Sequence, residues 1–440
     1  MCGIAGVFER EGVRASRSLL GAMAGELRHR GPDGVGMYLD DRLGMVNTRL
    51  SIVDLSGGDQ PIGSETGRFW VMQNGEIYNH PELRAELKAA GHVFTTQCDT
   101  EVLVHAYEQW GEDMLHRLIG AFAIAIWDRE KSELFLARDR LGIRPLFVAD
   151  CAGALLFASE AKALLRHEGM QRVIDPLALL EIFTLWGAAP ERSAFEGVRE
   201  LPPGTWLRVG ADGTRTERCW WQLEFAERGS QRQESADALK EELLALLTDA
   251  TRLRLRADVP VGAYLSGGLD SSAIAALVRR ESTQELRSFA VRFADRRFDE
   301  REHQDRMAAT LGTRLQAVEI TGREVAEVFP EVIRLSEKPM FRTAPAPLLL
   351  LSKLARESGF KVVLTGEGAD EMFAGYNIFK EAKIRRFWAR QPKSQVRPLL
   401  LRRLYPYLGK DLGRTGGFLG AFFGRDLDRF EEPLFSHGIR

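Results

Sequence analysis

The hydrophobic pattern of this 440-residue chain changes near residue 235, and the change restricts which folds the chain can adopt. Before it, short apolar runs alternate with Gly-Asp, Pro-Asp and Asn-Gly turn signals, a pattern typical of β-strands. Helical patterns at 81–90 and 100–110 interrupt these runs. The pattern therefore predicts a sheet-rich α+β domain over residues 2–210, with strands at 43–47, 69–73, 121–127, 133–137 and 154–158.

The second half alternates between helical and strand patterns. A linker over 211–235, polar and weakly periodic from 222 onward, is expected to separate it from the first half. Such alternation predicts βαβ units and a parallel sheet over 236–440, with a ligand at the C-terminal ends of the strands. The expected helices are 236–256, 271–281, 299–311 and 345–358, and the expected strands are 259–265, 287–293, 315–320 and 361–365.

Composition excludes several classes of function. The net charge of −2 gives no electrostatic reason to expect nucleic acid or an anionic membrane as a partner. No apolar run approaches the roughly 20 residues that span a bilayer, and the N-terminus lacks a secretion signal. The four cysteines show no C-x-x-C spacing, which argues against a zinc site of that type or a disulfide framework. These features predict a cytoplasmic protein that uses neither nucleic acid nor membrane.

The N-terminus, MCGIAG, places a cysteine directly behind the initiator methionine. Loss of Met1 would give Cys2 a free α-amine beside its thiol, which no internal cysteine has. An α-amine with a pKa of about 7.7–8.0 is a suitable proton acceptor near neutral pH. The position of Cys2 is therefore a candidate for nucleophilic chemistry.

Two loops that each follow an apolar strand carry glycines and acidic residues. In YLSGGLDSS (264–272), glycines permit close backbone approach, and hydroxyls and a helix N-terminus favour an anion. Asp270 within it would repel phosphate unless Mg²⁺ stands between them. TGEGADE (365–371) adds Glu367, Asp370 and Glu371. The pair predicts a nucleotide–Mg²⁺ site, whereas either loop alone is equally consistent with an ordinary β-to-α turn.

Several longer motifs occur together in a fixed order. They resemble class II glutamine amidotransferases of the N-terminal-nucleophile type and, with the second half included, glutamine-hydrolysing asparagine synthetases. The resemblance implies an αββα sandwich of antiparallel sheets followed by an α/β parallel-sheet adenylating domain. The motifs are RHRGPDG (28–34), NTRLSIVD (47–54), QNGEIYN (73–79), CDTEVL (98–103), RDRLGIRPL (138–146), SEAKALL (159–165), LPPG (201–204), DVPVGAYLSGGLDSS (258–272) and KVVLTGEGADEMFAGY (361–376).

For the first domain, the resemblance implies a glutaminase. Met1 is removed, and the Cys2 thiol attacks the side-chain amide of glutamine. The Asn74 amide and the Gly75 backbone N–H form the oxyanion hole. The glutamine-binding residues are then Arg49 for the α-carboxylate, Glu76 and Asp99 for the α-ammonium, and Leu50, Ser51, Ile52 and Val53 around them. Surface ion pairing is the plainer alternative for the three charged residues.

For the second domain, the resemblance implies adenylation of aspartate by ATP to give β-aspartyl-AMP and pyrophosphate. Ammonia from the first site then displaces AMP and yields asparagine. Asp270 and Asp370 take the place of Mg²⁺ ligands, and Glu367 that of a carboxylate assisting adenylation or ammonia attack. The implied ATP-binding residues are Leu265, Ser266, Gly267, Gly268, Asp270, Ser271, Ser272, Val291, Thr365 and Gly366. The oligomeric state, including a homodimer, stays open.

The sequence departs from the family pattern after Tyr376. Members of the family continue with a segment of the type E-x-R-x-P-F-L-D, which does not occur here. The synthetase domain is therefore expected to be incomplete at its C-terminus, with glutamate released in excess of asparagine. The basic stretch 380–404 is expected to be a solvated helix face. Two alternatives remain: amidation of a carboxylate other than aspartate, and a glutaminase-only or regulatory remnant.

Overall fold

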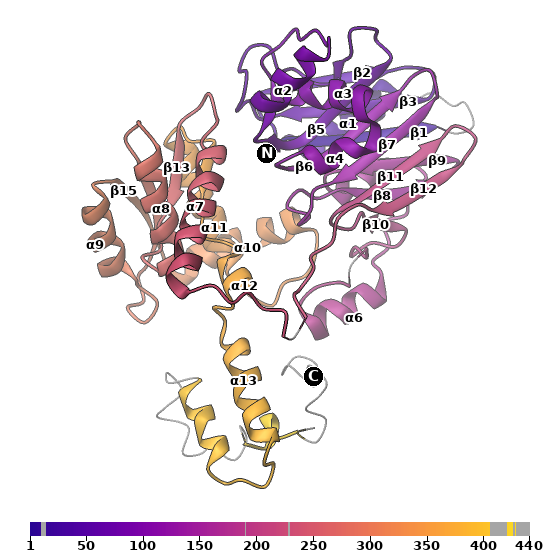
Figure 1. The fold of residues 1–440 in the computed structure, drawn as a ribbon. Helices are drawn as coiled ribbons and strands as arrows, with labels where there is room; N and C mark the ends of the chain where they lie inside the picture. The colour runs from indigo at the N-terminus through magenta and orange to yellow at the C-terminus, as the bar shows by residue number, and fades with distance from the viewer. Residues whose placement is uncertain (10–14, 190, 228, 405–419, 426, 428–440) are drawn as a thin grey trace. The chain divides into compact units, whose positions relative to one another are not determined.

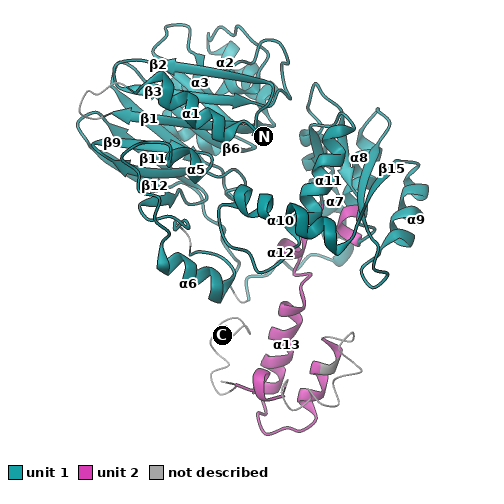
Figure 2. Ribbon diagram, turned by 180° about the vertical axis from the view of Figure 1, so that it is seen from behind, with its two compact units in different colours: residues 1–268, 272–365 teal, residues 269–271, 366–440 magenta. Residues whose placement is uncertain are grey.

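The computed structural model describes residues 1–9, 15–189, 191–227, 229–404, 420–425 and 427. The chain divides into two compact units, which are coloured separately in Figure 2. Unit 1 is Met1–Gly268 with Ser272–Thr365, and unit 2 is Leu269–Ser271 with Gly366–Arg440. Unit 1 therefore holds the sheets of both predicted domains.

Two six-stranded antiparallel sheets make up the first half of unit 1 (Figure 1). The first, in the order β10-β8-β9-β1-β3-β2, consists of β1 (Gly3–Glu9), β2 (Gly34–Leu39), β3 (Leu43–Arg49), β8 (Phe147–Cys151), β9 (Ala154–Ala158) and β10 (Val198–Glu200). The second, in the order β12-β11-β7-β6-β5-β4, consists of β4 (Ile62–Gly63), β5 (Phe69–Ile77), β6 (Gly120–Asp128), β7 (Glu133–Arg138), β11 (Thr205–Gly210) and β12 (Arg215–Cys219).

Apolar side chains from the two sheets meet in a shared core. Phe8 and Met45 from the first sheet pack in one cluster with Met72, Trp127 and Leu136 from the second. Strand β1 is buried along its whole length because it pairs with β3 on one side and β9 on the other. This central position fixes Cys2, the residue immediately before β1.

Helices cover the outer face of each sheet. Helix α1 (Arg17–Leu27) starts at Ser16, whose hydroxyl accepts a hydrogen bond from the Leu19 amide. It packs on the first sheet together with α5 (Ala161–Leu164). The second sheet is covered by α2 (His80–Ala89), α3 (Asp99–Trp110) and α4 (Met114–Arg117), with a short 3₁₀ turn at Gly111–Asp113 between the last two. These four layers confirm the predicted αββα sandwich.

The connection to the second half differs from the expected linker at its start. Strand β12 lies within the predicted linker 211–235 and pairs with β11, so the second sheet continues to Cys219. Before this connection, α6 (Pro176–Leu185) is capped by Asp175. Helix α7 (Ala236–Arg254) begins one residue after Ser235, which caps it.

The second half of unit 1 contains a four-stranded parallel sheet in the order β15-β14-β13-β16, as predicted from the alternating pattern. Its strands are β13 (Val261–Tyr264), β14 (Arg287–Phe293), β15 (Arg314–Ile320) and β16 (Val362–Leu364). The chain order reverses between β13 and β16, and ligands of open α/β sheets bind at such switch points. Helices α8 (Leu269–Glu281) and α9 (Arg301–Leu311) pack in one apolar cluster with the sheet, and α11 (Pro345–Glu357) packs in another. Helix α10 (Gly322–Ser336), which the sequence pattern did not predict, contacts α11.

Unit 2 contains α12 (Ala369–Phe373), α13 (Asn377–Ala389) and a 3₁₀ segment at Arg397–Arg403. Trp388, Leu401 and Phe423 form its small core. Arg385 is buried and donates to the backbone carbonyls of Phe423 and Arg425, so the basic stretch is not wholly the solvated face that was expected. In the part of the chain that the structure describes, none of the helices is long and apolar enough to cross a membrane.

Candidate active site

The Cys2 thiol lies in a small pocket at the N-terminal end of β1. Its Sγ atom accepts a hydrogen bond from the Leu50 amide at 3.4 Å. The Cys2 carbonyl accepts from Arg30 Nε at 3.0 Å, and Arg30 Nη1 pairs with Glu160 Oε1 at 2.7 Å. These bonds hold the backbone of Cys2 rigidly, and the sequence analysis did not assign a role to Arg30 or Glu160.

Strand β5 carries the two residues expected to form the oxyanion hole. An alanine at Gly75 would place its Cβ 2.2 Å from the Ala121 carbonyl oxygen on β6, so only glycine allows this strand pairing. Asn74 is fully buried beside the nucleophile. In the amide orientation that satisfies its neighbours, its Nδ2 donates to the Cys2 carbonyl at 2.8 Å and its Oδ1 accepts from Arg30. The structure thus brings Asn74 to Cys2, with its amide bound to the backbone of that residue.

The guanidinium of Arg49 is buried and anchored by the loop that follows it. It pairs with Asp59 Oδ1 at 3.0 Å and donates to the carbonyl oxygens of Val53, Asp54 and Leu55. A carboxylate arriving at Arg49 would meet a cation whose position is already fixed. Leu50, Ile52 and Val53 line the pocket with it, whereas the Ser51 amide donates to Asp33 Oδ2 at 2.9 Å.

Asp99 is the first residue of α3, and a buried polar network holds its carboxylate. Its Oδ2 accepts from Gln73 Nε2 at 2.8 Å and from the Ile77 amide at 2.9 Å. Gln73 Nε2 also donates to Thr100 Oγ1, which accepts a further bond from Gln60 Nε2 at 3.0 Å. The sequence analysis missed Gln60, Gln73 and Thr100. Gln73 directly precedes Asn74 in the sequence, and Thr100 directly follows Asp99. This adjacency to two predicted site residues could have indicated them.

Burial shifts the pKa values of several groups in the pocket, and two of them, Cys2 and Glu76, bear on its chemistry. It raises the pKa of the Cys2 thiol, although the Leu50 amide and the chain's terminal amine act in the opposite direction. It also raises the pKa of Glu76 to about 7, and the neighbouring Asp99 adds to this shift. The resting thiol is therefore protonated near neutral pH, and Glu76 changes charge in that range.

The pKa of Glu76 leads to a pH-dependent prediction for glutamine binding. Because the carboxyl is protonated below its pKa of about 7, it loses its attraction for an α-ammonium as the pH falls. The dissociation constant of glutamine, measured by calorimetry on the non-hydrolysing Cys2→Ala variant, is expected to rise about tenfold from about pH 8 to about pH 6. The Glu76→Gln variant should bind glutamine weakly, with a dissociation constant that does not change between these pH values. The control variant Glu86→Gln, at an exposed position, should keep the wild-type pH dependence. If glutamine binding by Glu76→Gln still depended on pH, a group other than Glu76 would be responsible for the pH dependence.

The pocket is small while Met1 is in place. Its volume is about 40 Å³, and Met1 and Arg144 both line it. Arg144 also contacts the Met1 sulfur atom. Because each water needs at least about 10–15 Å³, this space holds a few waters and not an amino acid. Removal of Met1 would therefore enlarge the pocket as well as expose the amine of Cys2.

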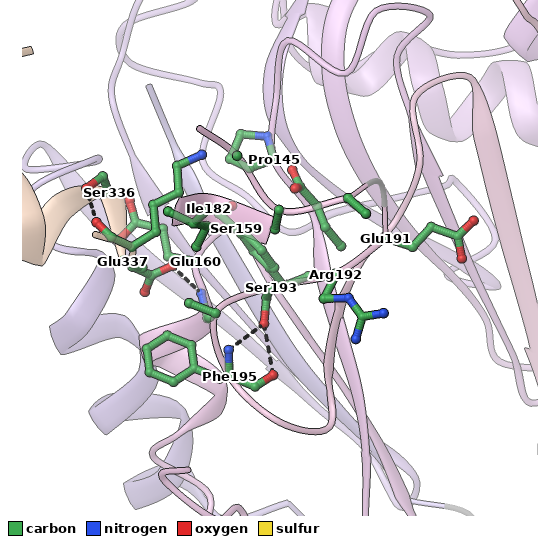
Figure 3. Close-up of a pocket in the computed structure, with 18 of the residues that line it drawn as sticks. Pro145, Ser159, Glu160, Ile182, Glu191, Arg192, Ser193, Phe195, Ser336 and Glu337 are labelled. Atoms are coloured by element: carbon green, nitrogen blue, oxygen red, sulfur yellow. Dashed lines mark hydrogen bonds between the residues drawn. The ribbon is translucent and has the colours of Figure 1, made fainter. Parts of the chain in front are cut away.

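A larger cavity of about 480 Å³ has Arg30 among its lining residues, and Figure 3 shows part of its wall. None of the residues predicted from the sequence lines it. Its wall includes Glu160 and Ser193 from the first half of the chain and Glu337 from the second. Glu337 accepts from the amides of Ala161 and Lys162, and its burial raises its pKa. Arg30 lines this cavity and also donates a hydrogen bond to the Cys2 carbonyl.

The loop that lines the Cys2 pocket is tied to the parallel sheet within unit 1. Lys361, which precedes β16, contacts Asp33 Oδ2 at 2.6 Å and the Ser51 carbonyl at 3.2 Å. Asp258, which precedes β13, accepts from the Asp54 amide at 2.7 Å and donates its own amide to Ile52. Residues 51–54 are thus held between the RGPDG turn and the start of two strands of the second half.

The first predicted nucleotide loop follows β13. Leu265 is buried at the end of this strand, and Ser266 Oγ accepts from the Gly268 amide at 3.2 Å. Ser272 follows in the first turn of α8, where its amide donates to the Gly268 carbonyl. Val291, on the adjacent strand β14, accepts at its carbonyl from Gln304. These residues cluster at the C-terminal edge of the sheet, and Thr365 directly follows β16 at the same edge.

Unit 2 brings the remaining predicted residues of the two loops together. An added Cβ at Gly366 would lie 2.8 Å from the Ser271 amide nitrogen and 3.0 Å from Asp270 Cβ, so the second loop packs on the first. The Gly375 amide donates to the Asp370 carbonyl at 2.9 Å and closes the turn after α12. Glu367 is exposed. Asp270, Glu367 and Asp370 therefore belong to one unit. Their carboxylate oxygens are of the ligand type that Mg²⁺ prefers.

Comparison with known proteins agrees with both halves of this arrangement. Residues 1–221 match the glutamine amidotransferase domain family, and residues 242–437 match the asparagine synthase family. Asparagine synthetase [glutamine-hydrolyzing] 1 of Bacillus subtilis is 35% identical over 404 residues, which cover 91% of this chain and 63% of that protein. A putative asparagine synthetase [glutamine-hydrolyzing] of Mycobacterium bovis is 36% identical over 438 residues, covering 95% of this chain and 64% of that protein.

A fungal protein is also similar. Amidase chyE of Penicillium rubens is 32% identical over 406 residues, covering 86% of this chain and 60% of that protein. The chain spans just under two thirds of the length of these relatives. With both domain families matched in order and the sandwich and parallel sheet in place, the chain belongs to the glutamine-hydrolysing asparagine synthetase family.

Proposed function

We propose that this chain hydrolyses glutamine at Cys2 and transfers the ammonia to a carboxylate that ATP has activated, with aspartate as the acceptor. One observation carries the proposal. The Cys2 thiol shares a pocket with a cation, Arg49, and two carboxylates, Glu76 and Asp99. This set of charges complements the α-carboxylate and α-ammonium of a free amino acid, and it leaves the side-chain amide for the thiol.

The first half-reaction follows from the protonation states in the pocket. The thiol is protonated at rest, so it needs a base before its sulfur attacks the amide carbon of glutamine. The α-amine of Cys2, free once Met1 is removed, takes that proton and passes it to the leaving ammonia. The Gly75 N–H and the Asn74 amide stabilise the oxyanion, which requires Asn74 to exchange its bond to the Cys2 carbonyl. Water then hydrolyses the thioester to glutamate.

The second half-reaction uses the loops at the switch point of the parallel sheet. A carboxylate oxygen of the acceptor attacks the α-phosphorus of ATP, and pyrophosphate leaves. Ser266, Ser271 and Ser272 would bind the departing phosphates through their hydroxyls. Mg²⁺, held by Asp270 and Asp370, would neutralise the phosphate charge that these carboxylates otherwise repel. Ammonia then attacks the acyl carbon, AMP leaves, and the amide forms.

The test is a measurement of AMP and pyrophosphate formation with a panel of carboxylates. The chain, glutamine, ATP and Mg²⁺ are incubated with aspartate, glutamate, a C-terminal peptide carboxylate or no acceptor. We expect AMP and pyrophosphate in equal amounts with aspartate only, accompanied by asparagine. Glutamate release without AMP under every condition would contradict the synthetase half and support a glutaminase-only protein.

The similarity to amidase chyE favours one second candidate, an amidotransferase that acts on another carboxylate. The Cys2 pocket does not distinguish the two, because it contacts only glutamine. AMP formation with a carboxylate other than aspartate, in the same panel, would replace aspartate as the acceptor and leave the glutaminase assignment intact.

A further inference from the structure

A cluster of four potential metal ligands lies outside the Cys2 pocket, on the outer side of the second sheet. Glu65, His92, His105 and Glu108 each place one ligand atom so that all four atoms lie within 4.8 Å of one another. Glu65 belongs to the turn between β4 and β5, and His92 to the loop after α2. The other two residues lie on one face of α3. The proposed function uses none of them.

The ring of His105 is buried without a hydrogen-bond partner. Its side chain is 1% exposed, and neither ring nitrogen has a hydrogen bond within the described residues. Its Nδ1 lies 3.3 Å from Glu65 Oε2, and its Nε2 lies 3.9 Å from Glu101 Oε1. A buried imidazole that lies 3.3 Å from a carboxylate and makes no hydrogen bond is an unusual arrangement in a folded protein. A cation beside Nδ1 would satisfy both groups.

A hydrogen bond fixes the orientation of His92. Its Nε2 lies 3.1 Å from Gln109 Oε1, an acceptor, so in the neutral ring the proton is on Nε2. The lone pair of Nδ1 then faces Glu65 Oε1 at 3.9 Å and Glu108 Oε2 at 3.8 Å. A lone pair and two carboxylates that converge on one point are a ligand set for a cation.

The dimensions and donor types of the cluster suit zinc. Zinc bonds of about 2.0–2.2 Å in a tetrahedron place neighbouring ligand atoms roughly 3.3–3.6 Å apart. The contacts His105 Nδ1–Glu65 Oε2 at 3.3 Å and His92 Nδ1–Glu108 Oε2 at 3.8 Å are near this spacing. The four ligand atoms lie within 4.8 Å of one another, so side-chain movements of about 1 Å would bring the wider pairs to it. Two imidazole nitrogens and two carboxylates favour Zn²⁺ over Mg²⁺ or Ca²⁺, which prefer oxygen ligands alone.

We propose that Glu65, His92, His105 and Glu108 bind a structural Zn²⁺ ion. Gln109 and Glu101 would orient the two rings from behind, as carboxylates and amides do around metal-bound histidines. The backbone amide of Val93 donates to Glu65 Oε1 at 2.7 Å and holds that carboxylate at the site. The ion would join the β4–β5 turn and the loop after α2 to α3, the helix that begins at Asp99 in the Cys2 pocket.

The alternative is a cluster of protonated histidines paired with glutamates and no metal. Zinc binding to the full chain distinguishes the two. The Cys2→Ala variant is used as the background chain because it lacks the Cys2 thiol, which could itself bind Zn²⁺. The chain is stripped of metal with a chelator and dialysed against ZnCl₂ in a buffer that contains Mg²⁺, which occupies sites made of oxygen ligands alone. We expect about one Zn²⁺ per chain and a higher melting temperature with Zn²⁺ than without it.

Matched variants assign the ion to the cluster. His92→Gln and Glu108→Gln should weaken Zn²⁺ binding at least about tenfold and lose the thermal shift, while His116→Gln and Glu86→Gln should keep both. Co²⁺ should give the intense visible absorption of a tetrahedral site in the background chain and not in the first two variants. Metal-free melting temperatures identify any variant that fails to fold, and Glu65→Gln then replaces it. No Zn²⁺ bound to the background chain, or equal binding by all variants, would refute the site whatever the enzyme's activity.

Discussion

Replacement of Cys2 by alanine is expected to abolish the release of glutamate from glutamine, with a loss of at least about 10³-fold in kcat/KM. Two free thiols, Cys2 and Cys98, line the pocket with Arg49, Glu76 and Asp99. Only Cys2 would gain an α-amine as its base once Met1 is removed, and alanine at position 2 leaves the pocket otherwise intact. Glutamate is measured with a coupled dehydrogenase assay. The exposed Cys219→Ala variant is the matched control and should retain wild-type activity.

Two further measurements make the assignment of Cys2 specific. Synthesis that uses added ammonium in place of glutamine should survive Cys2→Ala, because the second half-reaction does not use the thiol. Intact-mass analysis of the wild-type chain should show that Met1 is absent. Glutamine hydrolysis at the wild-type rate in Cys2→Ala, or full activity in a chain that keeps Met1, would exclude the N-terminal thiol as the nucleophile.

Replacement of Asp270 by asparagine is expected to suppress ATP–pyrophosphate exchange at least about 100-fold while glutaminase activity persists. The substitution keeps the size of the side chain and removes the charge that would hold Mg²⁺ against the phosphates. Exchange of radiolabelled pyrophosphate into ATP, in the presence of the acceptor carboxylate, measures the adenylation step alone. Asp370→Asn should behave in the same way, because the loop that carries it packs against Asp270 through Gly366.

The control for this prediction is Asp237→Asn, an exposed aspartate in the first turn of α7. It should leave both activities unchanged. Exchange that is unaffected by Asp270→Asn and by Asp370→Asn would remove these carboxylates from the nucleotide site. Loss of glutaminase activity together with exchange would instead indicate a folding defect.

The sequence predicted the elements with strong periodicity, and it failed where local signals conflict with the tertiary structure. The apolar run 121–127 became the buried strand β6 because period and burial agree there. Helix α10 was missed, since Pro330 lies inside it and proline normally ends a helix. Strand β12 was taken for linker because its residues are exposed and polar, and only its pairing with β11 makes it a strand.

Within the candidate site, motifs predicted which residues meet but not their states. Nothing in the letters NGE indicates that burial raises the pKa of Glu76 to about 7, or that Asn74 binds the Cys2 carbonyl. The histidine–glutamate cluster was also beyond sequence reasoning. Glu65 and His92 reach α3 from separate loops, and their spacing in the chain matches no metal-binding motif.

The central position of β1 in its sheet also has a consequence for when Met1 would be removed. Strand β1 is complete only when β9 pairs with it, and Ile4 bonds Ser159 across 155 positions of the chain. At a synthesis rate of about 5–20 residues per second, roughly 8–30 s pass between the emergence of these two segments from the ribosome. During that interval β1 can pair with β3 but lacks its second neighbour β9, and we expect the N-terminus to be accessible to an aminopeptidase. In the folded chain Met1 lines the Cys2 pocket and contacts Arg144. We therefore expect removal of Met1 to occur during translation, before the domain folds.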